Sequence, residues 1–278
     1  MGDVALAAGI MFGIALFFGV ILAIAYKKMR VEEDPRIDEV VARLPGANCG
    51  ACGQPGCRAF AELTVQGKLS PGKCTVNSAD GIADIADYLG VAADLQEKRV
   101  ARLHCAGGKS AVRNLADYRG SSSCRSAVVV NGGGRACPWG CLGLGDCARS
   151  CSFDAIAMNA DGLPVVDVVK CTACNDCVVV CPLSLLSIHA ISDHVLVQCS
   201  SPLTGLMAKA SCYVACDACG RCALDAPENV IVMQGGLPIV KAPSIATATA
   251  TFRCPTGAIQ WVEGNQFTQE TTDRRRHA

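Results

Sequence analysis

The first part of the chain holds one uninterrupted apolar run, from Val4 to Ala25, which contains 22 residues and no charged side chain. An α-helix of this length crosses the ~30 Å hydrocarbon core of a bilayer. Basic residues crowd positions 27–30 directly after the run, whereas Asp3 is the one charged side chain before it. The pattern predicts a transmembrane anchor over residues 1–26, with the rest of the chain on the cytoplasmic side of the inner membrane by the positive-inside bias.

A secretory signal peptide is the alternative interpretation, with Ala23-Ile24-Ala25 as a loose cleavage site. Such peptides have a basic stretch before a shorter apolar run, and here the basic residues follow a long one. The run also has no ionisable side chain at membrane depth, so the segment alone offers no path for ions. We therefore expect an anchor that packs on other membrane subunits.

Helical periodicity replaces the continuous apolar run over residues 27–90. Asp34 is placed to cap a helix that has Pro35 at its first position. A second amphipathic segment contains Phe60, and a third helix is expected over about residues 78–89. The apolar positions of the first helix follow the i, i+3, i+4, i+7 pattern at Ile37, Val40, Val41 and Leu44. These segments predict a small helical domain.

Further along the chain, short apolar runs of strand length alternate with turn residues. Turn glycines make hairpins of residues 155–166 and 230–240, and Val100–His104 and Val195–Gln198 have the composition of strands. A cysteine loop or its remnant, a short helix and a strand recur four times from residue 137 onward. The predicted fold class is α+β: the anchor, the helical domain and tandem ferredoxin-like units. The expected boundaries are a connecting α/β segment at 91–136, a two-cluster ferredoxin unit at 137–190, a reduced ferredoxin unit at 191–262 and a polar tail at 263–278.

Composition points to metal chemistry in a reducing compartment. The 278 residues include 20 cysteines, and aromatic residues make up 5%. The formal net charge of +0 counts cysteine as neutral. A 4Fe–4S core bound by four thiolates leaves about −2 per site, so the loaded protein is expected to be acidic and not to bind nucleic acid.

Four cysteines followed by a proline carry the strongest single motif. The spacing C-x2-C-x2-C-x3-C-P is that of a bacterial-type ferredoxin, in which the fourth cysteine ligates the neighbouring cluster. The run consists of Cys171, Cys174, Cys177 and Cys181, followed by Pro182. The exchange rule then joins the first three to Cys151, and joins Cys181 to Cys137, Cys141 and Cys147.

The second unit keeps one complete ligand set. Its run has Ala226 at the fourth position, and its other half keeps Cys254 alone. The exchange rule therefore groups Cys254 with Cys216, Cys219 and Cys222. In the helical domain a further 4Fe–4S set is expected from Cys49, Cys52, Cys57 and Cys74.

Four cysteines remain, and they offer a possible fifth cluster: Cys105, Cys124, Cys199 and Cys212. Inert buried thiols or another metal are the alternatives for this set. Zinc is the rival metal elsewhere, although its sites usually pair two C-x2-C knuckles. His104, next to Cys105, is an alternative stray ligand. No nucleophile–base pair, phosphate-binding loop or flavin motif is recognisable, so we expect no bond-making catalytic residue.

In combination, these motifs resemble those of one family. They are the anchor, Cys49-Gly50-Ala51-Cys52-Gly53 with Gly56-Cys57, Tyr118 with Gly120 and Cys124, Cys137-Pro138-Trp139-Gly140-Cys141 through Cys147, and the ferredoxin run. The order is similar to that in the B subunit of the Rnf ion-translocating ferredoxin:NAD oxidoreductase complex. The resemblance implies a membrane-tethered subunit at which electrons enter a translocase. Such a subunit accepts electrons from soluble ferredoxin and passes them to partner subunits, which hold the flavins and the ion path.

The functional prediction is a relay that moves single electrons through four 4Fe–4S clusters and a possible fifth. Two other functions remain open at this point. One is a freestanding membrane-anchored polyferredoxin that feeds another reductase. The other is a structural or sensing iron–sulfur module that is labile to redox change.

Overall fold

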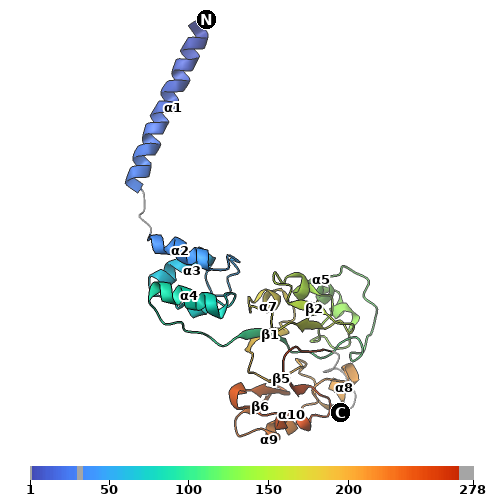
Figure 1. The fold of residues 1–278 in the computed structure, drawn as a ribbon. Helices are drawn as coiled ribbons and strands as arrows, with labels where there is room; N and C mark the ends of the chain where they lie inside the picture. The colour runs from blue at the N-terminus through green and yellow to red at the C-terminus, as the bar shows by residue number, and fades with distance from the viewer. Residues whose placement is uncertain (1, 30–33, 269–278) are drawn as a thin grey trace.

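The structure is a computed structural model that describes residues 2–29 and 34–268. Residues 269–278, most of the expected polar tail, lie outside the described part. The chain forms a long N-terminal helix, a helical domain and two small α+β units in sequence order (Figure 1). The predicted α+β class is therefore confirmed.

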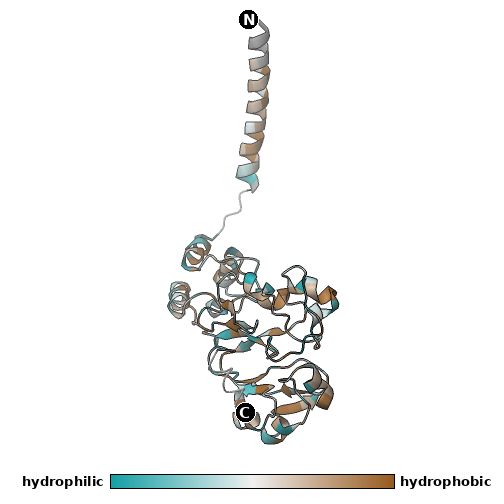
Figure 2. Ribbon diagram, turned by 90° about the vertical axis from the view of Figure 1, so that its right-hand side faces the viewer, coloured by the Kyte–Doolittle hydropathy of each residue, from teal (hydrophilic) through white to brown (hydrophobic). Residues whose placement is uncertain are grey.

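Helix α1 (Gly2–Met29) extends away from the rest of the ribbon (Figure 1). Its stretch Ala8–Lys28 is long and apolar enough to cross a membrane, and none of it is buried inside the protein. Figure 2 shows the hydrophobic colouring along this helix and a hydrophilic end at Lys27 and Lys28. A helix that is apolar on all sides requires lipid or partner helices around it.

The helical domain contains α2 (Pro35–Arg43), α3 (Cys57–Val65), the 3-10 turn η1 (Pro71–Lys73) and α4 (Ala79–Leu89). The Asp34 side chain accepts a hydrogen bond of 2.9 Å from the Arg36 amide, so the predicted cap is present. Helix α4 ends at Gly90, whose φ of 67° is the left-handed conformation that favours glycine. The core of the domain is formed by Ile37, Val40, Leu44, Phe60, Ala61 and Ile85.

The first α+β unit has two antiparallel strand pairs. Strand β1 (Arg99–Leu103) pairs with β4 (Leu186–Ala190), and β2 (Ile156–Met158) forms the predicted hairpin with β3 (Pro164–Val166). Its helical segments are α5 (Cys124–Val129), η2 (Asn131–Gly134), α6 (Asp146–Arg149) and α7 (Asp176–Val180).

The second unit repeats this plan. Strand β5 (Val195–Val197) pairs with β8 (Ile259–Trp261), and β6 (Ile231–Gln234) forms the second predicted hairpin with β7 (Leu237–Val240). Its helical segments are α8 (Gly205–Ser211), α9 (Arg221–Asp225), η3 (Pro243–Ile245) and α10 (Thr249–Phe252).

Each unit thus begins and ends with paired strands. Strand β1 falls in the segment expected to connect domains, yet it pairs along its whole length with β4, from Arg99 opposite Ala190 to Leu103 opposite Leu186. The segment 91–136 therefore supplies an edge of the first sheet. This pairing places Cys105, directly after β1, among the elements of residues 137–190.

The two units are joined at the ends of β1 and β5. The Ala106 amide donates to the Gln198 carbonyl at 2.9 Å, and the His104 ring nitrogen Nδ1 lies 2.8 Å from the Val197 carbonyl. Cys105 and Cys199 follow these two strands, so the junction brings cysteines of both units together.

Candidate iron–sulfur centres

All twenty cysteines lie within the described residues, and all are free thiols. They fall into five groups of four, defined here by shared cavities and by electrostatic proximity. In three of these groups the structure brings near one another the cysteines that the sequence groups. The other two differ from the prediction by the exchange of Cys124 and Cys137.

The helical domain contains the first group. One cavity between α2 and α3 is lined by Cys49, Cys52, Cys57 and Cys74. The Asn48 side chain accepts a hydrogen bond of 2.8 Å from the Cys57 amide, which fixes the start of α3 against the cysteine loop. The structure therefore brings together the four cysteines that the sequence groups.

The second group surrounds Cys177 on α7. Burial, followed by the charges of Cys171, Cys174, Cys147 and Cys151, raises the pKa of Cys177 to about 12. The Ala155 amide lies 3.4 Å from the Cys151 sulfur. The structure thus places Cys171, Cys174 and Cys151 close to Cys177, with Cys147 of a neighbouring group also nearby.

The third group lies in the second unit. Cys222 on α9 is close enough to Cys254 and Cys219 for their charge to raise its pKa, although burial is the larger cause. Burial likewise raises the pKa of Cys216, and the charges of Cys254 and Cys222 add to this effect. The ion pair between Arg253 and Asp225 holds the residue before Cys254 against α9, with 2.8 Å between Nε and Oδ2.

The fourth group includes Cys124. One cavity of the first unit is lined by four cysteines, Cys124, Cys141, Cys147 and Cys181. The Ser123 hydroxyl donates a hydrogen bond of 3.0 Å to Asp146 Oδ2, and the Arg125 amide donates to the same oxygen at 3.3 Å. These bonds hold the first turn of α5 against α6 and place Cys124 beside Cys147.

The fifth group includes Cys137. A second cavity, at the junction of the two units, is lined by Cys105, Cys137, Cys199 and Cys212. The isolated bridge between Val112 and Cys212 closes one side of this cavity. The Ala136 amide donates to the Arg113 carbonyl at 2.9 Å, which draws the following Cys137 towards the same side.

The structure thus corrects the expected grouping at two positions. The sequence-based set places Cys137 with Cys141, Cys147 and Cys181, whereas the structure places Cys124 there. The possible fifth set accordingly contains Cys137 in place of Cys124. The exchange of the fourth cysteine is kept, since Cys181 lines a cavity with Cys141 and Cys147. The expected set differs because it counts Cys137 in the same run as Cys141 and Cys147, whereas the backbone contacts of residues 112–136 place Cys137 beside Cys212.

Four of the five groups form a continuous series. Cys216 of the second unit lies near Cys199. The Cys141 amide donates a hydrogen bond to Cys105 Sγ at 3.2 Å. Cys147 lies near Cys177. Each group therefore lies near the next, from Cys216 to Cys177, and a hydrogen bond joins the two middle groups.

The electrostatics of the thiols favour a bound positive centre. Burial raises the pKa of Cys105 to about 11 and the pKa of Cys212 to about 12. Thiols with such values stay protonated at neutral pH, and iron releases these protons because it stabilises the thiolate. Backbone amides also point at the sulfurs, for example the Leu185 amide at 3.4 Å from Cys181 Sγ. Four thiols around each cavity, with amide donors, fit a cysteine-ligated cluster.

A single metal ion fits these groups less well. Among residues 2–29 and 34–268, no three Cys, His, Asp or Glu side chains are disposed to hold one ion. A zinc ion requires its sulfurs about 2.3 Å away. In three of the groups the four cysteines instead line one cavity, an arrangement that suits a group larger than one ion.

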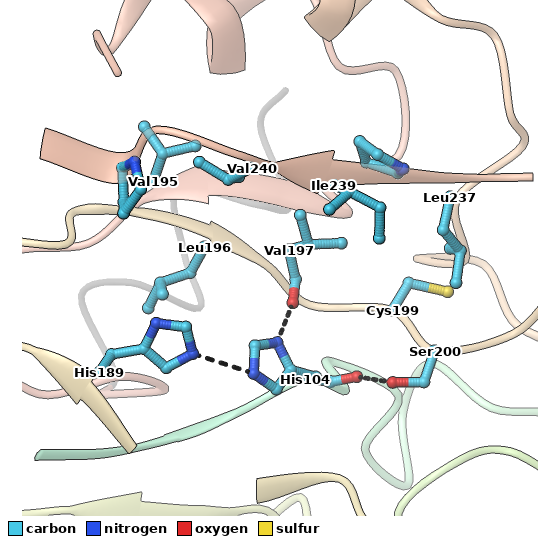
Figure 3. Close-up of a pocket in the computed structure, with 12 residues that line it drawn as sticks. His104, His189, Val195, Leu196, Val197, Cys199, Ser200, Leu237, Ile239 and Val240 are labelled. Carbon is cyan, nitrogen blue, oxygen red and sulfur yellow. Dashed lines mark hydrogen bonds between the residues drawn. The ribbon is translucent and has the colours of Figure 1, made fainter. Parts of the chain in front are cut away.

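The largest of the cavities described, about 330 Å³, lies between the two units (Figure 3). Apolar side chains of β5 and β7 form its walls, and His104 and His189 lie at one end. The Ser187 hydroxyl lies 2.6 Å from His104 Nε2 and 2.8 Å from His189 Nε2, so it links the two rings. No spacing signal marks this pair in the sequence, because the rings meet only through the pairing of β1 with β4.

A buried cation lies on β1, two residues before His104. The Arg102 side chain is 0% exposed, and its Nη1 donates to the Gly264 carbonyl at 2.6 Å. Its Nε and Nη2 have no hydrogen-bond partner in the described structure. Burial lowers the pKa of Arg102, and the nearby Cys171 opposes this effect. Sequence analysis missed this residue, since an arginine inside an apolar strand is the only signal available.

Comparison with known proteins agrees with this chemistry. Residues 44–76 match the model of the family described as "Putative Fe-S cluster". The chain is 43% identical over 208 residues to the B subunit of the Na(+)-translocating ferredoxin:NAD(+) oxidoreductase complex of Acetobacterium woodii, covering 75% of this chain and 62% of that protein. It is 35% identical over 261 residues to the B subunit of the ion-translocating oxidoreductase complex of Methanosarcina acetivorans, covering 94% of this chain and 97% of that protein. The B subunit of the proton-translocating ferredoxin:NAD(+) oxidoreductase complex of Clostridium ljungdahlii is 36% identical over 264 residues, with 93% of each chain covered.

The apolar helix, the cysteine groups and these relatives define a membrane-anchored iron–sulfur protein that serves as one component of an oxidoreductase complex. The chain belongs to the family of B subunits of the Rnf ion-translocating oxidoreductase complexes. Its partners therefore include the other subunits of such a complex.

Proposed function

We propose that the chain is the electron-relay subunit of an ion-translocating ferredoxin:NAD oxidoreductase. It receives single electrons from soluble ferredoxin and passes them to partner subunits. It holds five 4Fe–4S clusters, one in each cysteine group, and its two α+β units lie on the cytoplasmic side of the membrane. Lys27 and Lys28 at the end of α1 support this orientation by the positive-inside bias.

The series of four neighbouring cysteine groups is the observation that supports this proposal most. The contact between Cys141 and Cys105, with 3.2 Å between the amide nitrogen and the sulfur, joins two of the groups directly. A structural or sensing role requires no such series, because a single centre suffices to stabilise a small domain. Four adjacent centres across two units are what a relay requires.

The polypeptide has three tasks in this function. Its cysteines hold the clusters, each of which exchanges one electron when bound. Its buried cavities keep water away from the centres, and its backbone amides donate to cysteine sulfurs, for example from Gly107 to Cys105 Sγ at 3.4 Å. Both features set the reduction potential of each centre. The ion path and the reduction of NAD are assigned to partner subunits.

The group formed by Cys49, Cys52, Cys57 and Cys74 occupies a separate position in the chain. It lies in the helical domain between α1 and the two α+β units in sequence order. We assign it to the exchange of electrons with membrane subunits, since this domain follows the anchor directly.

Anaerobic stopped-flow mixing with reduced ferredoxin tests the function. The full chain, purified with its clusters in detergent or nanodiscs, is expected to lose its oxidised-cluster absorbance when it is mixed with an excess of reduced ferredoxin, which supplies one electron for each cluster. A protein that is reduced by a small reductant but not by ferredoxin contradicts the relay function. A protein that contains zinc in these groups contradicts it as well.

A further inference from the structure

Electrical charge is distributed unevenly over the first α+β unit. Residues 91–136 contain eight Lys and Arg against three Asp and Glu. Residues 137–190 contain two Lys and Arg against five Asp and Glu. Bound clusters, at about −2 each, make the cysteine-rich part still more negative. The excess of positive charge is therefore concentrated in one segment.

Residues 113–130 form an exposed layer that we name the basic edge. Arg113, Arg119 and Arg125 are exposed. None of the three makes an ion pair within the part of the chain that the structure describes. Asp117 is the one acidic residue of the layer. Three cations without ion-pair partners, against one acidic residue, give the exposed side chains of this layer an excess of positive charge.

Backbone contacts hold the two ends of the basic edge against residues 131–135. The Leu115 amide donates to the Gly134 carbonyl at 2.7 Å, and the Ala116 amide donates to the same carbonyl at 3.2 Å. Asn114 forms a bridge with Arg135. Helix α5 packs on η2, which contains Gly134. The strand-like start of the layer and α5 at its end are thus held together.

The basic edge covers two of the cysteine groups. Cys124, within the layer, lines the cavity shared with Cys141, Cys147 and Cys181. Val112, just before the layer, lines the cavity with Cys105, Cys137, Cys199 and Cys212. The Arg113 amide donates to the Ser211 carbonyl at 3.1 Å, next to Cys212. A protein bound here is therefore close to two proposed centres.

Apolar side chains are also exposed on this edge. Leu115 is 66% exposed, Val129 is 83% exposed and Val130 is 57% exposed. Exposed apolar groups beside unpaired cations are the composition of a transient protein interface, in which charge steers the encounter and apolar contact holds it briefly. A surface that binds lipid does not need to lie near a redox centre. A surface that binds an electron carrier does, and the basic edge lies next to two cysteine groups.

We propose that the basic edge, residues 113–130, is the docking surface for an acidic, soluble one-electron carrier protein of the ferredoxin type. The inference rests on the proposed function and adds the surface at which the electron enters. A small iron–sulfur carrier is itself negative at its cluster, so it complements the three arginines. Electrons enter the series at the groups of Cys124 and Cys105, in its middle.

A pair of charge-reversal variants tests this surface. Arg113→Glu/Arg119→Glu changes the edge and leaves Arg125, next to Cys124, in place. Lys68→Glu/Lys241→Glu changes the net charge equally at two exposed lysines in the helical domain and the second unit. All proteins are used as full chains with their clusters. The dissociation constant for a bacterial two-cluster ferredoxin and the second-order rate of reduction by it are measured from low to high salt.

The edge variant is expected to be reduced at least ~10-fold more slowly than the control variant at low salt, with a weaker dependence on salt. Its dissociation constant rises in parallel. Its rate with photoreduced deazaflavin, a small reductant without net charge, stays within twofold of wild type. Equal rates with ferredoxin for both variants overturn the docking proposal. Vesicles of anionic lipid that bind the control variant but not the edge variant, with unchanged ferredoxin rates, overturn it in favour of a membrane contact. If ferredoxin reduces neither wild type nor control, the proposed function itself fails.

Discussion

The backbone amide of Cys141 donates a hydrogen bond of 3.2 Å to the sulfur of Cys105, although the two residues lie in different cysteine groups. The bond connects the cavity at the junction of the two units with the cavity inside the first unit. Because an amide donor stabilises negative charge on sulfur, it favours the thiolate at Cys105. The two adjacent cysteine groups are therefore linked through one peptide group.

The grouping of the cysteines predicts different iron losses in two double variants. Cys124→Ala/Cys141→Ala removes two ligands of the same group and is expected to lose one cluster, or about four iron atoms. Cys137→Ala/Cys141→Ala removes ligands of two groups and is expected to lose two clusters, or about eight iron atoms. Iron and sulfide analysis under anaerobic conditions measures both. A loss of two clusters from the Cys124/Cys141 variant and of one cluster from the Cys137/Cys141 variant would contradict this grouping and support the one expected from sequence.

Arg102 is expected to raise the reduction potential of the centre that contains Cys171. A unit charge about 10 Å away in a medium of effective dielectric constant about 20 is worth roughly 1–2 kcal/mol. For a one-electron couple this is on the order of 50 mV. Arg102→Gln should therefore lower one potential in an EPR redox titration by about this amount.

Arg102→Lys keeps the charge and serves as the control for that titration. If the Arg102→Lys variant has the wild-type reduction potential and the Arg102→Gln variant has a lower one, the positive charge is the cause of the shift. Equal potentials in all three proteins contradict an electrostatic role for Arg102.

Gly134 and Gly132 offer a test variant and a matched control for the packing of the basic edge around Cys124. Both have positive φ, at 74° and 61°. A Cβ at Gly134 would lie 2.3 Å from the Ala116 carbonyl oxygen, whereas at Gly132 nothing lies within 4 Å. Gly132→Ala should cost only the backbone strain of about 1–2 kcal/mol. Gly134→Ala should lower the free energy of unfolding clearly more than Gly132→Ala does. It should also speed the loss of one cluster in guanidinium, which is measured as the decay of visible absorbance. Similar rates in the two variants contradict the close packing at Ala116.

Stability is expected to fall below pH 6.5 because of His189. Burial, followed by the charge of His104, lowers the pKa of His189, while Asp193 raises it and Arg102 lowers it. Ser187 is the neutral hydrogen-bonding neighbour. The unfolded chain, with a pKa of about 6.5, then binds a proton that the folded chain does not. The stabilisation by neutral His189 is thus complete above that pH and is lost as the pH falls towards the folded pKa.

His189→Asn should reduce the slope of the free energy of unfolding against pH below pH 6.5, by at most about 1.4 kcal/mol per pH unit. The rate of cluster loss at a fixed guanidinium concentration, measured from pH 5.5 to 8, checks it. Wild type and variant should diverge below pH 6.5. Parallel profiles show that His189 has no part in the pH response.

Local sequence signals were enough for the elements but not for every site. Asp34, Gly90 and the turn glycines act within a few residues of where they lie, so the helices and hairpins that they delimit follow from sequence. The ferredoxin-run group around Cys177 is likewise local, since three of its cysteines share one loop. The positions of Cys124 and Cys137 depend instead on long-range contacts, such as the Ser123–Asp146 hydrogen bond and the Val112–Cys212 bridge. Sequence spacing does not contain those contacts.

The iron and sulfide content of the anaerobically purified full chain is the most direct measurement. Five four-cysteine centres predict about 20 iron atoms and about 20 sulfides per chain, with four of each in every cluster. A value of about 16 for both contradicts a centre in every group. Zinc in place of iron contradicts the relay as a whole.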